Sequence, residues 1–128
     1  VNGRLRKPTL QLCDLSPALS RMKCVGVPMP GTDPTGGVTL LGFRDRIDCM
    51  MTKTKPKKIE MIGSDGRVHP FLLKGREDMH LDERMMQLLR IVTGLMKGHR
   101  ASNSRRLTAR HYDVIPLGPR SGLIQWVE

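Results

Sequence analysis

One lysine near the middle of the chain stands where it could do chemistry. Lys74 closes the apolar run at residues 71–73. Carboxylates follow it within one short loop and one helical turn: Glu77, Asp78, Asp82 and Glu83. An ammonium group beside apolar side chains is costly to bury unless an anionic group meets it. A lysine held by carboxylates in a cleft is one way to bind phosphate, so the pattern raises nucleotide binding as a hypothesis.

Two plainer interpretations of the same residues remain open. A lysine at the end of a strand often reaches water with its ammonium group while its stem covers apolar surface. Acidic residues at the start of a helix are favoured by the positive end of the helix dipole, whether or not a lysine lies nearby.

Apolar runs predict the strands that must position this lysine. They lie at residues 38–43, 47–51, 58–62, 67–74, 109–117 and 122–127. A tight loop at residues 63–66 joins the third and fourth runs. Pro70 should mark an edge or a bulge in the fourth, because proline has no N–H to donate to a sheet. Residues 25–31 should be extended, and residues 31–37 should form a loop.

One long helix should follow the acidic cluster. Its apolar residues recur at helical spacing and predict a single buried stripe: Leu81, Met85, Leu88, Leu89, Val92 and Met96. Gly98 is a plausible stop, and residues 101–106 should be a basic loop. Ser16 and Pro17 offer the N-cap and first position of a shorter helix. This order predicts an α+β lobe with a mostly antiparallel sheet.

Composition bounds the class of protein. A chain of 128 residues is one domain or one lobe of a larger one, and its net charge of +10 favours anionic partners. The aromatic residues are too few and scattered for a base-stacking platform, so we expect no direct nucleic-acid binding. No apolar run has the length needed to span a bilayer. Because the chain starts at Val1 without a leader, we expect an internal fragment of a longer soluble protein.

Cysteines and histidines predict no metal site. Cys13, Cys24 and Cys49 form an odd, widely spaced set that suits reduced thiols in the cytosol or nucleus. Neither these residues nor the histidines form pairs at zinc-ligand spacing. We therefore predict a cytoplasmic protein, with the nucleus as a second compartment.

The basic run at residues 53–58 admits three interpretations. It suits a nucleic-acid patch or localisation signal, or a solvated loop before a strand. In the third interpretation, Thr52, Lys53 and Thr54 lie in a flexible turn between two strands, whose hydroxyls and backbone N–H groups could cover a triphosphate. Familiar phosphate loops are excluded, because residues 31–37 lack the lysine and hydroxyl of a Walker A loop and the chain has no Gly-x-Gly-x-x-Gly run.

Several long motifs together resemble the phosphatidylinositol-3-kinase-related protein kinases. The run FLLKGREDMHLDERMMQ at residues 71–87 is similar to the core of their small lobe. The run RHYDVIPLGPRSGLIQWV at residues 110–127 is similar to the strand pair that leads into their hinge. Within the family, the runs HLDER, TKTKPKK and SGLIQWV look most like the SMG branch, which acts in nonsense-mediated mRNA decay. The TOR branch usually has Arg-Gln before Asp-Glu-Arg and a glycine before the hinge tryptophan.

The resemblance implies a protein-kinase-like, PI3/PI4-kinase-type small lobe and assigns roles to its residues. Lys74 matches the phosphate-contacting lysine, Glu77 an acid close to it, and Asp82 the helix acid deep in the ATP cleft. The remaining ATP contacts fall on the hydroxyl of the phosphate loop, an inner-cleft tyrosine, the gatekeeper-like position and the hinge: Thr52, Tyr112, Ile124, Trp126 and Val127. Residues 1–22 would then be a helical lead-in and residues 23–128 the amino-terminal lobe, which ends at the hinge.

The resemblance also implies catalytic and metal-binding motifs that lie beyond the hinge in this family. Its catalytic loop and its metal-binding Asp-Phe-Gly lie in a large lobe, and no Asp-Phe-Gly occurs here. Mg²⁺ or Mn²⁺ would be held mainly by that lobe, so we expect the isolated chain to bind ATP weakly and to phosphorylate nothing. The implied partners are ATP, the rest of the kinase chain and a protein substrate, an RNA helicase of mRNA surveillance. The alternative is a non-catalytic basic interaction module, a truncated or pseudokinase product that binds RNA or acidic partners.

Overall fold

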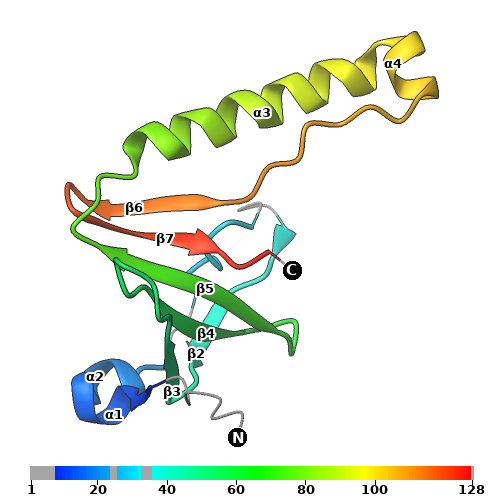
Figure 1. The fold of residues 1–128 in the computed structure, drawn as a ribbon. Helices are drawn as coiled ribbons and strands as arrows, with labels where there is room; N and C mark the ends of the chain where they lie inside the picture. Colours follow the sequence, from blue (N-terminus) through cyan, green and yellow to red (C-terminus); the bar gives the residue numbers. More distant parts are fainter. Residues whose placement is uncertain (1–7, 24–25, 33–35, 128) are drawn as a thin grey trace, which may run out of the picture.

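The computed structural model describes residues 8–23, 26–32 and 36–127. Its centre is a twisted antiparallel sheet, and one long helix lies beside the last strands (Figure 1). The predicted α+β architecture is confirmed. The elements are β1 Thr9–Gln11, α1 Leu12–Leu15, α2 Pro17–Ser20, β2 Leu40–Phe43, β3 Arg46–Cys49, β4 Lys57–Gly63, β5 Val68–Gly75, α3 His80–Gly98, α4 Arg100–Ser104, β6 Val114–Gly118 and β7 Ser121–Gln125.

The sheet runs in the order β1-β3-β4-β5-β7-β6, and β2 pairs with β4 beside β3. Every strand pair in the described part of the chain is antiparallel. β2 and β3 follow the same edge of β4 in succession, because β2 pairs with its end and β3 with its beginning. Between them the backbone N–H of Arg44 donates to the carbonyl of Glu60 at 2.9 Å, which continues the ladder.

The hairpin between β4 and β5 has the predicted tight loop. Gly66 has a φ of 72°, a left-handed conformation that glycine adopts without steric cost. The Asp65 carboxylate accepts hydrogen bonds from the Arg67 backbone N–H at 3.0 Å and meets the His69 ring nitrogen at 3.0 Å. These hydrogen bonds favour the ionised carboxylate and lower the pKa of Asp65.

The prediction for Pro70 is wrong. It lies in β5, an inner strand, and pairs with Glu60 without a register shift. Its carbonyl accepts from the Trp126 backbone N–H at 3.0 Å, beyond the end of β7 at Gln125. The nitrogen and carbonyl of one residue face the same side of a strand. The missing N–H of Pro70 therefore faces the side on which β7 has already ended.

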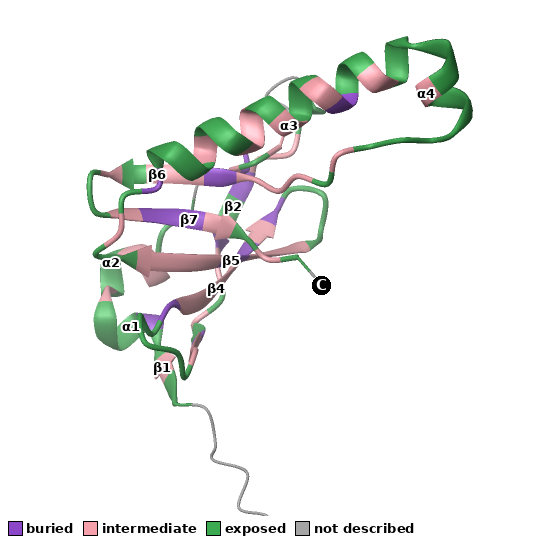
Figure 2. Cartoon of the chain, turned by 45° about the horizontal axis from the view of Figure 1, so that its top comes forward, coloured by how far each residue is buried: buried purple, intermediate pink, exposed green. Residues whose placement is uncertain are grey.

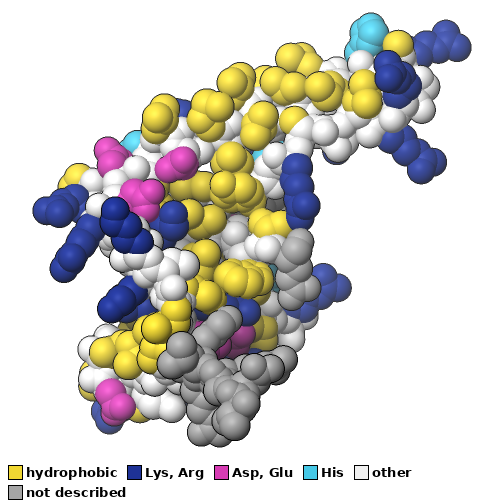
Figure 3. All heavy atoms as spheres, in the orientation of Figure 1, with side chains coloured by type: hydrophobic (Ala, Val, Ile, Leu, Met, Phe, Trp, Pro, Cys, Tyr) yellow, Lys and Arg dark blue, Asp and Glu magenta, His cyan; other side chains and the backbone are white. Residues whose placement is uncertain are grey.

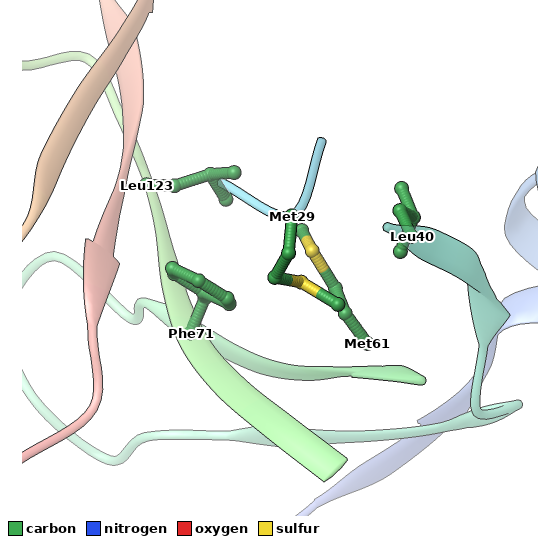
Figure 4. Packing of buried hydrophobic residues seen from close by; sticks show 5 residues of the cluster. All are labelled: Met29, Leu40, Met61, Phe71 and Leu123. Atoms are coloured by element: carbon green, nitrogen blue, oxygen red, sulfur yellow. The ribbon is translucent and has the colours of Figure 1, made fainter. Parts of the chain in front are cut away.

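One face of the sheet carries the hydrophobic core. Phe71 and Met29 are almost fully buried there, and side chains from distant segments converge on them (Figure 4). The buried members of this cluster are Met29, Leu40, Met61, Phe71 and Leu123. Because side chains alternate along a strand, burying Phe71 on this face sends its neighbours Leu72 and Pro70 to the other.

The predicted stripe of α3 is divided between two faces. Leu89, Val92 and Met96 are half-buried, and Thr93 exchanges hydrogen bonds with the backbone of Ala109 at 2.9 and 3.0 Å. The other predicted members point outward, and hydrophobic side chains follow the helix in Figure 3. The exposed apolar residues of α3 are Leu81, Met85, Leu88, Ile91 and Leu95. Figure 2 accordingly shows α3 mostly in the exposed colour.

The N-terminal helices are short: α1 lies against β1 and α2 against β2. The Ser16 side chain accepts from the Leu19 backbone N–H at 3.3 Å and Pro17 stands at the first position of α2, which confirms the predicted capping pair. A strand that the pattern did not indicate, β1, precedes them and pairs with β3. The Cys13 thiol donates to the Asp45 carboxylate at 3.2 Å, and this hydrogen bond raises the pKa of Cys13.

The predictions for the end of α3 and for the loop after it have different outcomes. α3 ends at Gly98 as predicted, whereas the expected basic loop begins with the short helix α4. Some residues of the predicted segments lie outside the described residues: Cys24 and Val25, residues 33–35 of the predicted loop, and the first seven residues of the lead-in. Within the described part, no helix is both long and apolar enough to cross a membrane.

Candidate functional site

The sheet face opposite the core is built from rows of side chains in register. We call it the Lys74 face, after the lysine that shares it with Leu72 two residues earlier on β5. One row crosses four strands: Lys58 on β4, Leu72 on β5, Ile124 on β7 and Val114 on β6. Lys74 lies opposite Gly122 in the adjacent row. Pro70 and Trp126 meet on the other side of the Leu72 row.

This register sets the length of the site. Lys74 and Pro70 are four residues apart on β5, which corresponds to about 13 Å along an extended strand. A basic group therefore lies at one end of the face, the row that contains Leu72 and Ile124 lies in the middle, and an indole lies at the other end.

Of the carboxylates that follow Lys74 in the sequence, Glu77 forms an ion pair with it. The Lys74 Nζ lies 3.4 Å from the Glu77 carboxylate, and the two side chains are 26% and 42% exposed. An ion pair this accessible contributes at most about 1 kcal/mol, so its effect is to orient the lysine rather than to stabilise the fold. Asp82 is exposed in the first turn of α3, and no ion pair joins it to Lys74 within the described residues.

Met79 covers the sheet at Gly122, the residue that pairs with Lys74. Its side chain is fully buried, although it lies between the acidic loop and α3. A Cβ atom at Gly122 would lie 2.6 Å from the Met79 sulfur and 2.9 Å from the carbonyl oxygen of Ile115. Only glycine fits at that position, because Met79 occupies the space that any side chain there would need.

The start of α3 is fixed by an acid that precedes it. The Asp78 carboxylate accepts from the His80 backbone N–H at 3.0 Å and lies 2.5 Å from the ring nitrogen of the same residue. These hydrogen bonds, the side-chain one first, lower the pKa of Asp78. Asp78 thus supports the helix start, whereas the neighbouring Glu77 turns to Lys74.

The predicted phosphate loop is an exposed turn between β3 and β4. The carbonyl of Thr52 accepts from the Lys55 backbone N–H at 3.0 Å, and Lys55 has a φ of 45°. The turn borders a hollow of about 600 Å³ whose lining carries four cations and no carboxylate. Its lining residues are Lys53, Thr54, Lys55, Lys57, Gly75 and Arg76. Arg76 also has a positive φ, of 62°, so two strained cationic residues face the same hollow.

Three of the predicted hinge and inner-cleft residues come together at the other end. Tyr112, Ile124 and Val127 line one cavity of about 450 Å³, which Arg110 and Gln125 complete. Apolar walls with a few polar groups are typical of small-molecule sites. This cavity is where the structure gathers the residues that sequence resemblance assigned to the adenine end.

Trp126 is not among the residues that line that cavity, although Gln125 and Val127 on either side of it are. It contacts a residue that sequence reasoning did not assign to the site. The Lys58 ammonium stands 4.7 Å from the centre of the indole ring. Lys58 belonged to a basic run that we interpreted as a patch or a loop. The signal that could have found it is alternation along β4, which places residue 58 on the same face as Leu72.

The described side chains offer no metal centre. Within the part of the chain that the structure describes, no group of three or more His, Cys, Asp or Glu side chains could hold a metal ion. The carboxylates near Lys74 already serve other partners, since Glu77 pairs with the lysine and Asp78 with His80.

Comparison with known proteins identifies the relatives of this chain. Residues 69–128 match the family described as phosphatidylinositol 3- and 4-kinase. The serine/threonine-protein kinase SMG1 of Danio rerio is 48% identical over 120 residues, which cover 93% of this chain and 3% of the relative. The probable serine/threonine-protein kinase smg1 of Dictyostelium discoideum is 53% identical over 91 residues, which cover 71% of this chain and 4% of the relative.

A solved structure shares the fold. The structure described as the FAT and kinase domain of CtTel1 superposes with a TM-score of 0.74 at 26% identity, over 95% of this chain and 10% of that chain. The chain spans only 3% to 5% of the length of the SMG1 relatives above and of the smg-1 kinase of Caenorhabditis briggsae. Its sequence motifs, its relatives and its fold lead to the same conclusion: the chain belongs to the phosphatidylinositol-3-kinase-related protein kinases, as a segment of their kinase domain.

Proposed function

We propose that this chain is the ATP-holding amino-terminal lobe of an SMG-like serine/threonine protein kinase that acts in nonsense-mediated mRNA decay. The observation that carries the proposal is the order of groups along the Lys74 face. A lysine and a cationic turn lie at one end of that face, and a cavity lined by Tyr112, Ile124 and Val127 lies at the other. The identities to SMG1 kinases support the assignment to this branch.

The residues present fit a nucleoside triphosphate in their chemistry. Lys74 offers an ammonium group whose rotamer Glu77 fixes, so positive charge is ready where phosphate charge must be stabilised. The hydroxyl and backbone N–H groups of the turn at Thr52 can cover the phosphates, and the apolar row at Leu72 and Ile124 excludes water. Trp126 and Val127 would supply the packing surface and backbone edge for the base. Asp82 would contribute from α3 once the cleft is closed.

In the complete kinase, ATP would supply the γ-phosphoryl group that passes to a serine or threonine hydroxyl, and a bound Mg²⁺ or Mn²⁺ would neutralise phosphate charge. The groups that hold the metal and align the hydroxyl belong to a second lobe. The partners of the full-length kinase are therefore the rest of its own chain and a protein substrate, an RNA helicase of mRNA surveillance. We place the kinase in the cytoplasm, with the nucleus as a second compartment, since free Cys13 and Cys49 suit a reducing environment.

Replacing the lysine in a full-length kinase that carries this chain tests the proposal. Lys74→Met should abolish phosphoryl transfer and leave the midpoint of thermal unfolding unchanged, because the Lys74–Glu77 pair is too exposed to stabilise the fold strongly. Lys97→Met, in the exposed last turn of α3, is the matched control and should retain activity. Full activity in the Lys74→Met kinase would refute the assignment.

The isolated 128-residue chain provides an independent check. ATP with Mg²⁺ should shift its unfolding temperature little, because only one side of the cleft is present. Strong magnesium-dependent stabilisation, or phosphate transfer by this chain alone, would contradict the proposed division of labour between the lobes. Salt-dependent binding of RNA without any effect of ATP would instead favour the alternative of a basic interaction module.

A further inference from the structure

Lys58 contacts Trp126, although the ATP contacts proposed above give Lys58 no role. The Lys58 ammonium lies 4.7 Å from the centroid of the indole, within the range of a cation–π interaction. Both side chains are only partly exposed. The lysine therefore covers one face of the ring that is proposed to support the base.

The backbone holds the two residues in place from opposite sides of β5. Lys58 pairs with Leu72, and the Trp126 backbone N–H donates to the carbonyl of Pro70 at 3.0 Å. Leu72 and Pro70 are neighbours on the same strand face, so β5 fixes the spacing between the lysine and the tryptophan. Trp126 lies one residue beyond the end of β7, and this hydrogen bond to Pro70 holds its backbone beside β5. Lys58 is the charged group that the structure places against that ring.

We propose that Lys58 is a positioning residue for nucleotide binding: its ammonium group holds the Trp126 indole against the sheet as the outer wall of the base site. This inference rests on the proposed function. The attraction comes from the negative face of the indole, which is strongest for tryptophan among the aromatic residues. A held ring presents its other surface to the base, whereas a free ring must first be ordered at an entropic cost.

Two substitutions separate the charge of Lys58 from its shape. Lys58→Met keeps a long apolar side chain and removes the ammonium group, and Lys58→Arg keeps a cation that stacks on indole. In a full-length kinase that carries this chain, Lys58→Met should raise the KM for ATP about two- to fivefold and leave kcat unchanged, as expected for a single cation–π contact. Lys58→Arg should restore the KM, and Lys97→Met should not change it.

A spectroscopic readout follows the ring directly. Trp126 is the single tryptophan of the 128-residue chain, so its fluorescence reports on this contact alone. Lys58→Met should shift the emission maximum to the red and increase quenching by acrylamide, because the ammonium group no longer holds the indole against the sheet. Lys58→Arg should behave like the unchanged chain. Circular dichroism of each variant verifies that the fold is retained.

The outcomes distinguish this inference from the proposed function. If Lys58→Met changes neither the emission of Trp126 nor the KM for ATP, the positioning role of Lys58 is refuted. If Trp126→Ala raises the KM for ATP in that case, the proposed base site still stands. If Trp126→Ala and Lys74→Met both leave ATP use unaffected, the proposed function fails. A change in emission without a change in KM would also overturn the role of Lys58 in binding.

Discussion

Replacing Gly122 with alanine is the most direct test of how this lobe is packed. The added Cβ would lie 2.6 Å from the Met79 sulfur, 2.9 Å from the Ile115 carbonyl oxygen and 3.3 Å from the Pro116 Cα. Met79 is fully buried and the other two contacts are backbone atoms, so none of the three can withdraw freely. Overpacking of this kind costs about 1–3 kcal/mol of unfolding free energy. At about 4 °C per kcal/mol for a domain of this size, the unfolding midpoint should fall by roughly 4–12 °C.

Differential scanning calorimetry of the 128-residue chain measures this loss, and the same hairpin offers a control. At Gly118 an added Cβ would meet only the Ser121 hydroxyl oxygen, at 3.9 Å, so Gly118→Ala should leave the midpoint nearly unchanged. In a Met79→Ala background, Gly122→Ala should cost less than it does alone, since the closest atom has been removed. Equal midpoints for Gly122→Ala and Gly118→Ala would refute the packing argument.

Three further predictions address local hydrogen bonds. Thr93→Val should lower the unfolding free energy by about 1–3 kcal/mol in urea titrations, because both backbone groups of Ala109 lose their partner, whereas Thr93→Ser should not. Asp45→Asn should speed alkylation of Cys13 by iodoacetamide at pH 8, because the carboxylate raises the pKa of that thiol; an unchanged rate would contradict this. Because the folded-state pKa of Asp65 is lowered, its contribution to stability is present above about pH 4 and is lost as the pH falls below it, so Asp65→Asn should flatten the dependence of the urea midpoint between pH 5 and pH 2.

Local patterns predicted the elements around the site well, because each depends on neighbouring residues. The tight loop at residues 63–66, the Ser16–Pro17 start of α2 and the end of α3 at Gly98 are set by turn and capping preferences. Position within the sheet is a different property. Pro70 alone suggested an edge strand, but the end of β7 at Gln125 is what leaves its nitrogen without need of a partner.

The apolar pattern of α3 shows a second limit of sequence reasoning. The leucines and methionines of α3 lie on more than one face of the helix, so helical periodicity could not tell which of these side chains would be buried. The structure buries Thr93 and leaves Leu81 74% exposed. Thr93 is inside because the backbone of Ala109, distant in sequence, satisfies both hydrogen-bonding functions of its hydroxyl.

The sequence by itself determined the kinds of group present at the site and the family to which they belong. Lys74, its acids and the hinge motif are contiguous runs whose residue types carry that information. Only the tertiary structure decided which of these groups meet: Glu77 contacts Lys74, Asp78 instead meets His80, and Lys58 covers Trp126. The contact of Lys58 with Trp126 depends on strand register and on the face of the sheet from which each side chain projects, and pairing between distant segments sets both. The contacts of Glu77 and Asp78 depend on the path of the short loop that joins β5 to α3.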